Sequence, residues 1–410
     1  MTASADTRTD PARWPDVAAV PHAPVRARFA SELVRRIAAR VPLRVETRTG
    51  AVGDPGLPVL LLHRPQAFFH RVGTGGLIGF GESYQAGDWD SDDLPRLLTA
   101  LAANVDHLVP RGLQTLRRPF AAAAPSRQDN TRDNARRNIA DHYDLSNDLF
   151  ALFLDETMTY SSALFGGADA TWDDLAEGQR RKIDRLLDRT GVGPGTRVLE
   201  IGTGWGELAV RAAERGATVH TITLSANQLE RAQALAARRG VADRIDAELL
   251  DYRDLAPGRR YDAVVSVEMI EAVGERYWPE YFATLRCALE PGGKVGLQAI
   301  TMRHDRMTAT RRGYTWIHKY IFPGGIIPSL PVIERHAAAA GLRIGDRLDF
   351  GADYARTLRL WRERFISRAD RLAGLGFDET FRRTWEFYLA YSEAGFATGY
   401  LDVRQLILEA

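Results

Sequence analysis

From about residue 138 to the C-terminus, short apolar runs alternate with longer amphipathic stretches. Apolar runs suited to strands lie near 197–201, 218–223, 246–250, 261–267 and 293–299, with helical patterns between them. This alternation is typical of an α/β fold in which crossover helices connect parallel strands. We therefore predict a doubly wound, Rossmann-like parallel sheet. The aromatic segments 305–330 and 354–400 are expected to form a helical cap over its ligand face.

The first 115 residues follow a different pattern. Residues 25–40 have the spacing of an amphipathic helix that is apolar at Phe29, Leu33 and Ile37 and otherwise rich in arginine. Short strands are expected at 43–47, 59–63 and 67–71, and a helix at 94–103. These elements predict a small α+β domain over 21–115, preceded by a polar, disordered tail over 1–20. A linker over 116–137, rich in alanine and arginine, then leads to a catalytic domain over 138–410.

Composition limits the partners and the compartment. The 410 residues carry 54 basic and 53 acidic side chains, a formal net charge of +1, so no overall field favours nucleic acid. The single cysteine, Cys287, excludes an internal disulfide and a cysteine-rich metal centre, and is expected as a small core residue of a helix over 281–289. No apolar run approaches the roughly 20 residues that span a bilayer, and no signal peptide is seen. We expect a cytoplasmic protein without a metal, in peripheral contact with the inner face of the membrane at most.

The strongest single motif joins the first of these strands to its helix. The run Val198-Leu-Glu-Ile-Gly-Thr-Gly-Trp-Gly-Glu207 delivers Glu200 into a turn formed by Gly202, Gly204 and Gly206, and a helical pattern follows. Glycine accepts positive φ and lets the backbone approach a ligand closely, so this arrangement forms a cradle for a nucleotide-type cofactor. The third glycine comes one residue earlier than in the dinucleotide fingerprint. This spacing favours S-adenosylmethionine over another nucleotide or a purely structural turn.

Polar residues at the ends of the next two strands complete the expected cofactor site. Ligands of a parallel sheet lie beyond the carboxyl ends of its strands. Thr223, Ser225 and Gln228 follow the second strand, where their hydroxyl and amide groups can bond ribose hydroxyls. Asp251 and Tyr252 follow the third strand. The carboxylate of Asp251 either accepts a hydrogen bond from an adenine amino group or caps the helix that follows it.

Several segments together resemble one enzyme family. Asp141-His-Tyr-Asp-Leu-Ser-Asn-Asp-Leu-Phe150 and Met158-Thr-Tyr-Ser161 look like the entrance motif of the cyclopropane fatty acid synthases, which include the mycolic acid cyclopropane synthases. Further similar stretches lie at 200–206, 223–228, 251–254, 267–274, 320–325 and 350–358, and the resemblance covers about 138–408. It implies a class I methyltransferase fold with S-adenosylmethionine bound by Tyr160, Ser161, the glycine turn and Gln228. The implied substrate is the cis double bond of an acyl chain, usually within a phospholipid at the membrane surface.

The resemblance also locates the step that removes a proton. In typical members a bicarbonate ion is the base, held by a cysteine, a glutamate, a histidine and a tyrosine. The glutamate and the tyrosine correspond to Glu271 and Tyr354, whereas Ser162 stands at the cysteine position and Gln298 at the histidine position. Glu268 stands where typical members have glycine. We expect its carboxylate to replace the bicarbonate and to share a proton with Glu271. In the alternative, Glu268 caps the following helix or pairs with an arginine.

The altered base site bears on the product. Proton loss during ring closure gives a cyclopropane, whereas a hydride shift before proton loss gives an exocyclic methylene group. We expect the methylene branch, which converts an oleoyl phospholipid to 10-methylenestearoyl, a precursor that a partner reductase would turn into a 10-methyl branched chain. A cyclopropane synthase is the alternative, and a small-molecule methyltransferase and a non-catalytic lipid-binding protein are further classes. The N-terminal domain is expected to bind lipid or to form a homo-oligomer.

Overall fold

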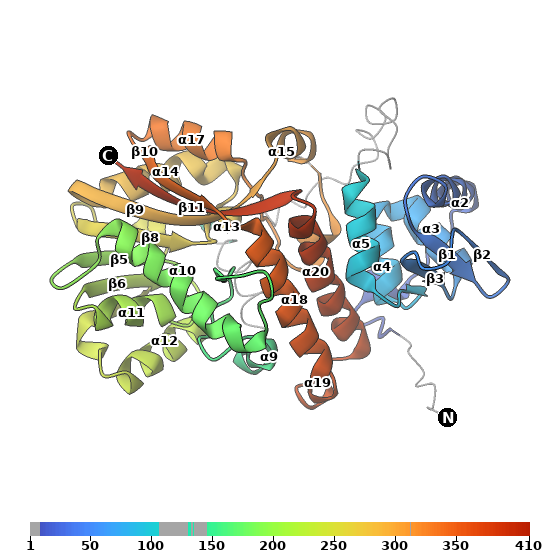
Figure 1. Ribbon diagram of the computed structural model, residues 1–410, viewed down its shortest axis with the longest axis horizontal. Coiled ribbons are helices and arrows are strands. Elements are labelled where there is room, and N and C mark those ends of the chain that lie inside the picture. Colours follow the sequence, from blue (N-terminus) through green and yellow to red (C-terminus); the bar gives the residue numbers. More distant parts are fainter. Residues whose placement is uncertain (1–8, 106–129, 133, 135–145, 312) are drawn as a thin grey trace. The chain divides into compact units, whose positions relative to one another are not determined.

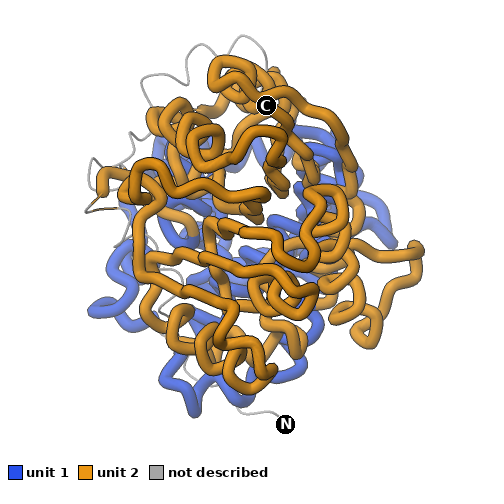
Figure 2. The backbone as a smooth tube through the Cα atoms, turned by 90° about the vertical axis from the view of Figure 1, so that its left-hand side faces the viewer, with its two compact units in different colours: residues 1–123, 313–321, 361–400 blue, residues 124–312, 322–360, 401–410 orange. Residues whose placement is uncertain are grey.

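The computed structural model of the protein describes residues 9–105, 130–132, 134, 146–311 and 313–410. The chain divides into two compact units, which Figure 2 shows in different colours. Unit 1 comprises 1–123, 313–321 and 361–400, and unit 2 comprises 124–312, 322–360 and 401–410. These units differ from the continuous domains expected at 21–115 and 138–410, because two later segments pack with N-terminal residues. Most of the expected linker, and residues 141–145 of the entrance motif, lie outside the described residues.

Unit 2 is built on a seven-stranded sheet with the order β10-β11-β9-β8-β5-β6-β7 (Figure 1). The strands are β5 Arg197–Ile201, β6 Thr218–Thr223, β7 Ile245–Leu249, β8 Tyr261–Val267, β9 Leu289–Met302, β10 Arg343–Asp349 and β11 Leu401–Glu409. The five expected strands, β5 to β9, are present and pair in parallel. The sheet is nevertheless mixed, because β10 and β11 pair antiparallel to each other and β11 to β9. β10 is an edge strand whose residues are exposed or half-buried, so it lacks the apolar run that predicts a strand.

Alternate side chains of the strands enter two separate cores. Leu199 of β5 lies opposite Val264 of β8, and both pack with α14 (Trp278–Cys287) and α17 (Leu330–Ala339). Val198 and Ala263, also opposite each other, pack with α10 (Leu175–Thr190) and α11 (Glu207–Glu214). Because side chains alternate in direction along a strand, a sheet covered on both faces needs apolar residues at every position. β8, with Ala263, Val264 and Val265 in succession, shows this most clearly in the sequence.

Further helices of unit 2 lie between the strands or before them. They are α9 Asn147–Phe153, α12 Ala226–Arg238, α13 Ile270–Val273, α15 His304–Thr310 and the first part of α18 Gly351–Ser367. One expectation is wrong here: Cys287 is exposed and is not a core residue. The buried stripe of α14 consists of Trp278, Tyr281, Phe282 and Leu285. Cys287 falls off this stripe, because its spacing from Leu285 is not the three or four residues that keep a helix position on one face.

Unit 1 combines a small sheet with helices from separate parts of the chain. The sheet has the order β2-β1-β3-β4, with β1 Arg44–Thr47, β2 Gly50–Val52, β3 Val59–Leu62 and β4 Trp89–Asp90. The helices are α1 Pro15–Ala18, α2 Pro24–Ala38, α3 Pro65–Gly75, α4 Leu77–Gln85, α5 Leu94–Ala103, α16 Trp316–Tyr320, α19 Asp370–Gly374, α20 Glu379–Ala397 and the remainder of α18. The strands expected at 43–47 and 59–63 and the helices expected at 25–40 and 94–103 are confirmed. Among the described helices, none has the length and apolar character needed to cross a bilayer.

Two N-terminal expectations are wrong. Residues 67–71 belong to helix α3 and not to a strand, because Pro65 fixes the first helical turn and Phe68 and Arg71, one turn apart, are both buried. Residues 15–18, expected within a disordered tail, form helix α1, where Val17 is 1% exposed. The guanidinium of Arg71 donates hydrogen bonds to three main-chain oxygens of this segment and so fixes it against α3.

Glycines within helix α4 serve close packing. A Cβ at Gly79 would lie 2.0 Å from the main-chain oxygen of Arg71, and one at Gly81 would lie 2.3 Å from the ring of Trp316. Glycine lowers helix stability by about 1 kcal/mol per residue, so packing overrides propensity here. Trp316 thereby reaches the ring of Phe387 in α20, at 4.7 Å between centroids. The segments 313–321 and 361–400 are thus part of the core of unit 1, and their expected role as a cap stays a prediction.

Candidate functional site

The glycine turn begins the site at the carboxyl end of β5. Gly202, Gly204 and Gly206 all have positive φ, with values of 99°, 52° and 97°. Gly206 is required for packing, since a Cβ there would lie 2.8 Å from that of Ala232 in α12. Gly204 differs, because a Cβ there would meet no described atom within 4 Å beyond its chain neighbours. The turn therefore combines an anchor to α12 with an open backbone edge against which a ligand can fit.

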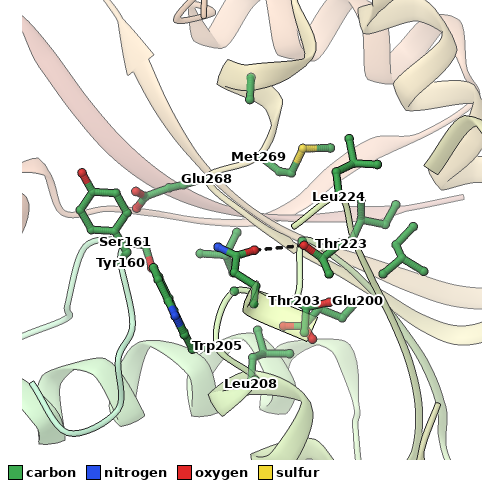
Figure 3. A pocket seen from close by; sticks show the side chains of 18 of the residues that line it. Tyr160, Ser161, Glu200, Thr203, Trp205, Leu208, Thr223, Leu224, Glu268 and Met269 are labelled. Carbon is green, nitrogen blue, oxygen red and sulfur yellow. Dashed lines mark hydrogen bonds between the residues drawn. The ribbon is translucent and has the colours of Figure 1, made fainter. Parts of the chain in front are cut away.

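A cavity beside this turn gathers most of the expected cofactor residues. The expected residues that line it are Tyr160, Ser161, Glu200, Gly202, Gly204, Gly206, Thr223, Gln228, Asp251, Tyr252 and Glu268. It also has an apolar wall that the sequence reasoning did not single out, which includes Met158, Trp205, Leu208, Leu224, Met269 and Val273. Figure 3 shows Glu268 beside Tyr160 and Ser161 at one end of the cavity, and Glu200 and Thr223 at the other. The cavity thus lies beyond the carboxyl ends of β5, β6 and β8, as expected for a parallel sheet.

Thr223, Ser225 and Gln228 hold one another in place. The hydroxyl of Thr223 donates to Oε1 of Gln228 at 3.0 Å and accepts from the main-chain N–H of Ser225 at 3.1 Å. The hydroxyl of Ser225 caps α12 by accepting from the main-chain N–H of Gln228 at 3.2 Å. Thr223 and Gln228 line the cavity, whereas Ser225 serves here as a helix cap. These bonds fix the polar groups beside the cavity in advance of binding.

Glu200 is a buried carboxyl group in the cavity wall. Its Oε2 accepts a hydrogen bond from the hydroxyl of Thr221 at 2.6 Å, and that hydroxyl also lies 2.7 Å from the hydroxyl of Thr203. Burial raises the pKa of Glu200 to about 8. The group therefore carries a proton near neutral pH and can donate a hydrogen bond as well as accept one.

Asp251 adopts the structural alternative considered for it. It caps the short 3-10 helix Tyr252–Asp254 by accepting from the main-chain N–H of Arg253 at 3.0 Å. Its second oxygen lies 2.6 Å from the guanidinium of Arg253. Burial alone would raise the pKa of Asp251, but the hydrogen bonds from Arg253 hold it below its usual range. Because Asp251 still lines the cavity, a contact with the cofactor stays a prediction.

Glu268 forms the centre of a second cluster at the other end of the cavity. Its Oε1 accepts from the main-chain N–H of Ser162 at 3.0 Å and from Nε2 of Gln298 at 2.8 Å. Its Oε2 accepts from the hydroxyl of Tyr354 at 2.9 Å. Direct hydrogen bonds therefore join four of the five residues expected around the base, Glu268, Ser162, Gln298 and Tyr354. The donors that the resemblance assigned to a bicarbonate ion are bonded to a carboxylate of the protein itself.

The backbone of Glu268 supports this reading. Its φ is 50°, in the left-handed region that glycine adopts freely and other residues rarely enter. An L-residue in this conformation costs about 1 to 2 kcal/mol. The strain is retained at a position where the carboxylate accepts three hydrogen bonds, which is typical of functional sites. The same backbone conformation explains why glycine suits this position in members that do not place a carboxylate there.

Ser162 contributes through its main chain and not through its side chain. Its hydroxyl donates to the main-chain oxygen of Ala163 at 2.9 Å, whereas its N–H is the group that reaches Glu268. Nε2 of Gln179, on α10, donates at 2.8 Å to the main-chain oxygen of Ser161, which belongs to the same peptide group as this N–H. That bond polarises the peptide and strengthens the N–H as a donor. A main-chain contact of this kind leaves no trace in the residue type.

The two alternatives considered for Glu268 are not what the structure shows. The N-cap residue of helix α13 is Met269, and the oxygens of Glu268 bond Ser162, Gln298 and Tyr354 instead of the start of the helix. Among the described residues, the cation whose charge acts on Glu268 is Lys182 and not an arginine. The carboxylate thus faces the cluster and the cavity.

Glu271, on α13, is the second buried carboxyl group of the cluster. Its Oε1 accepts from the main-chain N–H of Ile300, and no described residue hydrogen-bonds to its Oε2. Burial and then the charge of Glu268 raise the pKa of Glu271 to about 8. Burial also raises the pKa of Glu268, but the charge of Lys182 acts against it. Lys182 favours the ionised form of Glu268, and the charge of Glu268 in turn favours the protonated form of Glu271.

Two further residues of the cluster were missed from the sequence. Lys182 lines the cavity from α10, is 1% exposed, and donates from Nζ to Oγ of Ser161 at 2.5 Å. Gln405, on β11, donates to Oε1 of Gln298 at 3.0 Å and so orients the amide that faces Glu268. A signal existed for Lys182, because it stands in the buried stripe of an amphipathic helix next to Ile183. The sequence contained no such signal for Gln405, because its strand, β11, was not expected.

The described part of the entrance motif supports the aromatic wall of the cavity. Ser146 caps α9, and Oδ1 of Asn147 accepts from the indole N–H of Trp205 at 2.7 Å. The ring of Phe150 lies 5.1 Å from that of Tyr160 and 5.0 Å from that of Trp205. The motif therefore positions Tyr160 and Trp205, two rings that line the cavity.

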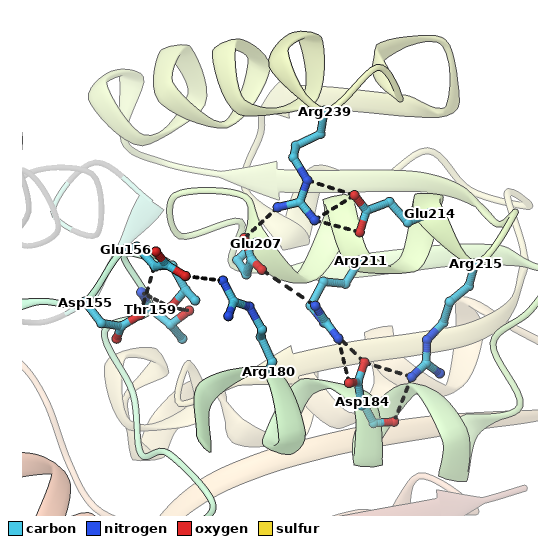
Figure 4. Close-up of polar contacts among 11 residues, drawn as sticks. Asp155, Glu156, Thr159, Arg180, Asp184, Glu207, Arg211, Glu214, Arg215 and Arg239 are labelled. Atoms are coloured by element: carbon cyan, nitrogen blue, oxygen red, sulfur yellow. Dashed lines mark hydrogen bonds and ion pairs between the residues drawn. The ribbon is translucent and has the colours of Figure 1, made fainter. Parts of the chain in front are cut away.

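A network of charges surrounds Glu207 next to the cavity (Figure 4). Glu207 begins α11 and is buried, with Arg239 at 3.9 Å and Arg211 at 4.0 Å. Burial raises the pKa of Glu207 against the effect of these arginines. Both cations also pair with other carboxylates, Arg211 with Asp184 at 2.6 Å and Arg239 with Glu214 at 2.7 Å. We interpret the network as a structural tie between helices α10, α11 and α12.

Known sequences resemble this chain over most of its length. The family profile described as mycolic acid cyclopropane synthetase matches residues 130–406. The tuberculostearic acid methyltransferase UfaA1 of Mycobacterium tuberculosis is 56% identical over 411 residues, which cover 97% of this chain and 96% of that protein. The cyclopropane-fatty-acyl-phospholipid synthase of Escherichia coli K12 is 33% identical over 373 residues, which cover 90% of this chain and 92% of that protein.

Solved structures resemble the larger part of the molecule. The mycolic acid cyclopropane synthase CmaA1, complexed with SAH and CTAB, has a TM-score of 0.62 at 31% identity and covers 67% of this chain and 98% of its own. The cyclopropane synthase MmaA2 from Mycobacterium tuberculosis has a TM-score of 0.61 at 32% identity, with the same coverage. These similarities confirm the class I methyltransferase fold that was expected from the sequence.

Proposed function

Because this chain belongs to the mycolic acid cyclopropane synthetase family of S-adenosylmethionine-dependent methyltransferases, we propose that it methylates the cis double bond of an oleoyl chain in a phospholipid and forms a 10-methylenestearoyl product. The observation that carries the proposed chemistry, methyl transfer followed by proton removal, is the carboxylate of Glu268, held at the cavity by Ser162, Gln298 and Tyr354. The name of the 56% identical relative, tuberculostearic acid methyltransferase, supports a branched-chain product.

The cavity fits the cofactor of the family. The open backbone edge at Gly204 and the preset pair of Thr223 and Gln228 would hold its nucleoside and amino-acid parts. Tyr160 and Ser161 would lie between the cofactor and Glu268. S-adenosylmethionine supplies an electrophilic methyl group when bound. The protein must therefore align this group with the alkene and exclude water, because an alkene is a weak nucleophile.

The proposed role of Glu268 is to remove a proton late in the reaction. The π electrons of the double bond form a bond from C10 to the methyl carbon, S-adenosylhomocysteine leaves, and C9 becomes a cation. A hydride shift from C10 to C9 moves the cation to the more substituted C10. Glu268 then takes a proton from the new methyl group, whose C–H electrons form the exocyclic double bond. An ionised carboxylate beside the cavity also stabilises the cation before that step.

A cyclopropane synthase is the second candidate, supported by the name of the 33% identical relative from Escherichia coli. It would use the same base, with proton loss from the methyl group coupled to closure of the ring onto C9. The Glu268 cluster serves either outcome, since both need a base at the methyl carbon. The higher identity to the tuberculostearic acid enzyme is what favours the methylene product. Reduction of the methylene product to a 10-methyl chain needs a hydride donor, and we assign that step to a partner reductase.

Mass spectrometry of cellular fatty acids would decide between these products. The protein is expressed in a host supplied with oleate, and the lipids are derivatised so that fragmentation distinguishes a methylene group from a cyclopropane, which have the same mass. We expect a 19-carbon product with its branch at C10, absent from the host that carries an empty vector. A cyclopropane would overturn the proposed product, and turnover of a soluble acceptor alone would indicate a small-molecule methyltransferase. Cofactor binding without turnover of lipid would indicate a lipid-binding protein.

We also propose that the protein acts peripherally at the inner face of the membrane, with residues 21–115 in contact with lipid. In α2, Val25, Phe29 and Leu33 follow one another at intervals of four residues and are 67%, 74% and 39% exposed. Arg36 continues the same face of the helix and is exposed, and Arg40 is exposed just beyond the end of the helix. An exposed apolar ridge among arginines suits an anionic bilayer interface. If this face of α2 packed against the same face of a second copy, the arginines of the two copies would lie close together. This repulsion disfavours a homo-oligomer through α2.

A vesicle binding assay tests this surface. We expect Phe29→Ser to lower co-sedimentation with vesicles of anionic oleoyl phospholipid at least severalfold, since it removes a large exposed apolar group. Leu249→Ser is the matched control, because Leu249 is 47% exposed on β7 in unit 2. Unchanged binding of Phe29→Ser would contradict the assignment. A change of oligomeric state in that variant would instead favour the homo-oligomer.

A further inference from the structure

Lys182 carries a positive charge in a place that water does not reach. Its side chain is 1% exposed on the inner face of α10 and lines the cavity. A buried ammonium group is unfavourable unless hydrogen bonds and an opposite charge compensate for its lost hydration. Burial lowers the pKa of Lys182 to about 8, although the charges of Glu268 and Asp155 act in the opposite direction. The retention of a lysine here therefore requires a reason beyond packing.

The hydrogen bonds of Lys182 hold the loop that joins the cofactor end to the base. Its Nζ donates to Oγ of Ser161 at 2.5 Å and to the main-chain oxygen of Ser162 at 3.3 Å. The main-chain N–H of Ser162 in turn donates to Oε1 of Glu268 at 3.0 Å. One ammonium group thus fixes two neighbouring residues, of which one lines the cavity and the other bonds the proposed base.

The remaining groups around Glu268 do not supply a positive charge. Gln298 from β9 and Tyr354 from α18 are neutral donors. Glu271 from α13 is itself an acid, whose pKa is raised to about 8 by burial and by the charge of Glu268. On the side of Lys182, Asp155 is a buried carboxyl group whose pKa is raised by burial. Within the described residues, Lys182 is therefore the cation that can keep Glu268 ionised.

We propose that Lys182 is a positioning residue for proton removal, which holds the 161–162 loop against Glu268 and keeps that carboxylate ionised through its charge. This inference rests on the proposed role of Glu268 as the base. It deepens that role, because it identifies the group that makes a buried carboxylate able to accept a proton at neutral pH. Lys182 itself exchanges no proton with the acyl chain.

The pH profile separates this role from a merely structural one. A base acts when deprotonated, so the rate falls as the pH falls through the pKa of Glu268. An adjacent positive charge lowers the pKa of a carboxyl group, and its removal is expected to raise that pKa by about 1 to 3 units. The acid limb of kcat for Lys182→Met should therefore move to higher pH by that amount. Near pH 7 we expect kcat about 10- to 100-fold below the wild-type value, with recovery as the pH rises.

The experiment compares three variants on vesicles of oleoyl phosphatidylglycerol between pH ~6 and ~9.5, with affinity for S-adenosylmethionine measured by calorimetry. Lys182→Met removes the charge and the donors, and Lys182→Gln removes the charge but keeps a donor for Ser161. We expect both to shift the acid limb. Lys294→Met is the control, because Lys294 on β9 is 41% exposed and is paired with Glu409 on β11, and its profile should match that of the wild type.

Several results would overturn the proposal. If Lys182→Met has a lower rate at every pH but an unshifted acid limb, the role of Lys182 is only structural. A wild-type pH profile in Lys182→Gln, or the failure of both variants to fold, would lead to the same conclusion. The role of Lys182 and the role of Glu268 as the base can be tested separately. Full activity of Glu268→Gln would remove the proposed base, whereas an inactive Glu268→Gln together with an unshifted Lys182→Met would overturn the role of Lys182 alone.

Discussion

The two ends of the cavity are built in different ways. The end that we propose for the cofactor uses main-chain groups and polar side chains, chiefly from two stretches of sequence, 198–207 and 223–228. The base end gathers buried ionisable and amide side chains from a loop, three helices and two strands that are far apart in the chain. The first depends on local backbone geometry and the second on tertiary packing. Affinity and chemistry should therefore respond to different substitutions.

Substitution of the turn glycines should separate packing from binding and have the largest effect on stability. Gly206→Ala combines an unfavourable φ of 97° with a Cβ 2.8 Å from that of Ala232, and is expected to lower the free energy of unfolding by about 2 to 4 kcal/mol. Gly204→Ala meets no such contact, so beyond the smaller cost of its own positive φ of 52° it should mainly weaken binding of S-adenosylmethionine. Urea denaturation and calorimetry check both variants. Equal losses of stability in the two would contradict the division of roles within the turn.

Loss of the Tyr354 hydroxyl should lower the rate and leave cofactor affinity unchanged. Tyr354→Phe removes one of the hydrogen bonds to Glu268, and a bond to a charged group contributes about 1.5 to 3 kcal/mol. We expect kcat to fall about 10- to 100-fold. Steady-state kinetics with a parallel measurement of S-adenosylmethionine binding tests this. A variant that lost affinity but kept kcat would place Tyr354 in the cofactor end instead.

A substitution at the cofactor end should produce the reverse pattern with a smaller effect. Thr223→Val removes the hydroxyl that bonds Gln228 and Ser225, and each such bond contributes about 0.5 to 1.5 kcal/mol. The expected result is an S-adenosylmethionine affinity roughly 3- to 10-fold lower at unchanged kcat. Thr218→Val on the same strand is the control, because Thr218 is exposed. A loss of kcat without a loss of affinity would argue against separate roles for the two ends.

Bicarbonate should have the smallest effect. The donors that would hold this ion already bond the carboxylate of Glu268, so we expect the rate in bicarbonate-free buffer to stay within about twofold of the rate with added bicarbonate. The assay uses degassed buffers and vesicle substrate. A dependence of tenfold or more would mean that an external base acts in this enzyme and that the role of Glu268 needs revision.

The same contrast explains what could be predicted from the sequence. The conformation of the glycine turn follows from a contiguous motif, and the five parallel strands follow from short apolar stretches, because local geometry and burial leave a direct pattern. β10 has no such apolar pattern. Strand β11 was not predicted either, so the amide of Gln405 could not be placed in the site. The resemblance located Glu268, Glu271 and Tyr354, but not the main-chain donor of Ser162 or the buried charge of Lys182. Helix α3 was mistaken for a strand, because a short apolar run is compatible with either structure.

A paired substitution of the two buried glutamates tests the central claim most directly. Single-turnover rates on oleoyl phospholipid vesicles are compared for Glu268→Gln and Glu271→Gln, with S-adenosylmethionine affinity measured for each. Glu268→Gln should lower the rate at least about 1000-fold with cofactor affinity retained, since an amide cannot accept the proton. Glu271→Gln should stay within about tenfold of the wild type, because Glu271, with its pKa near 8, is already neutral and an amide has the same shape. Wild-type activity of Glu268→Gln, or equal losses in both variants, would contradict the account.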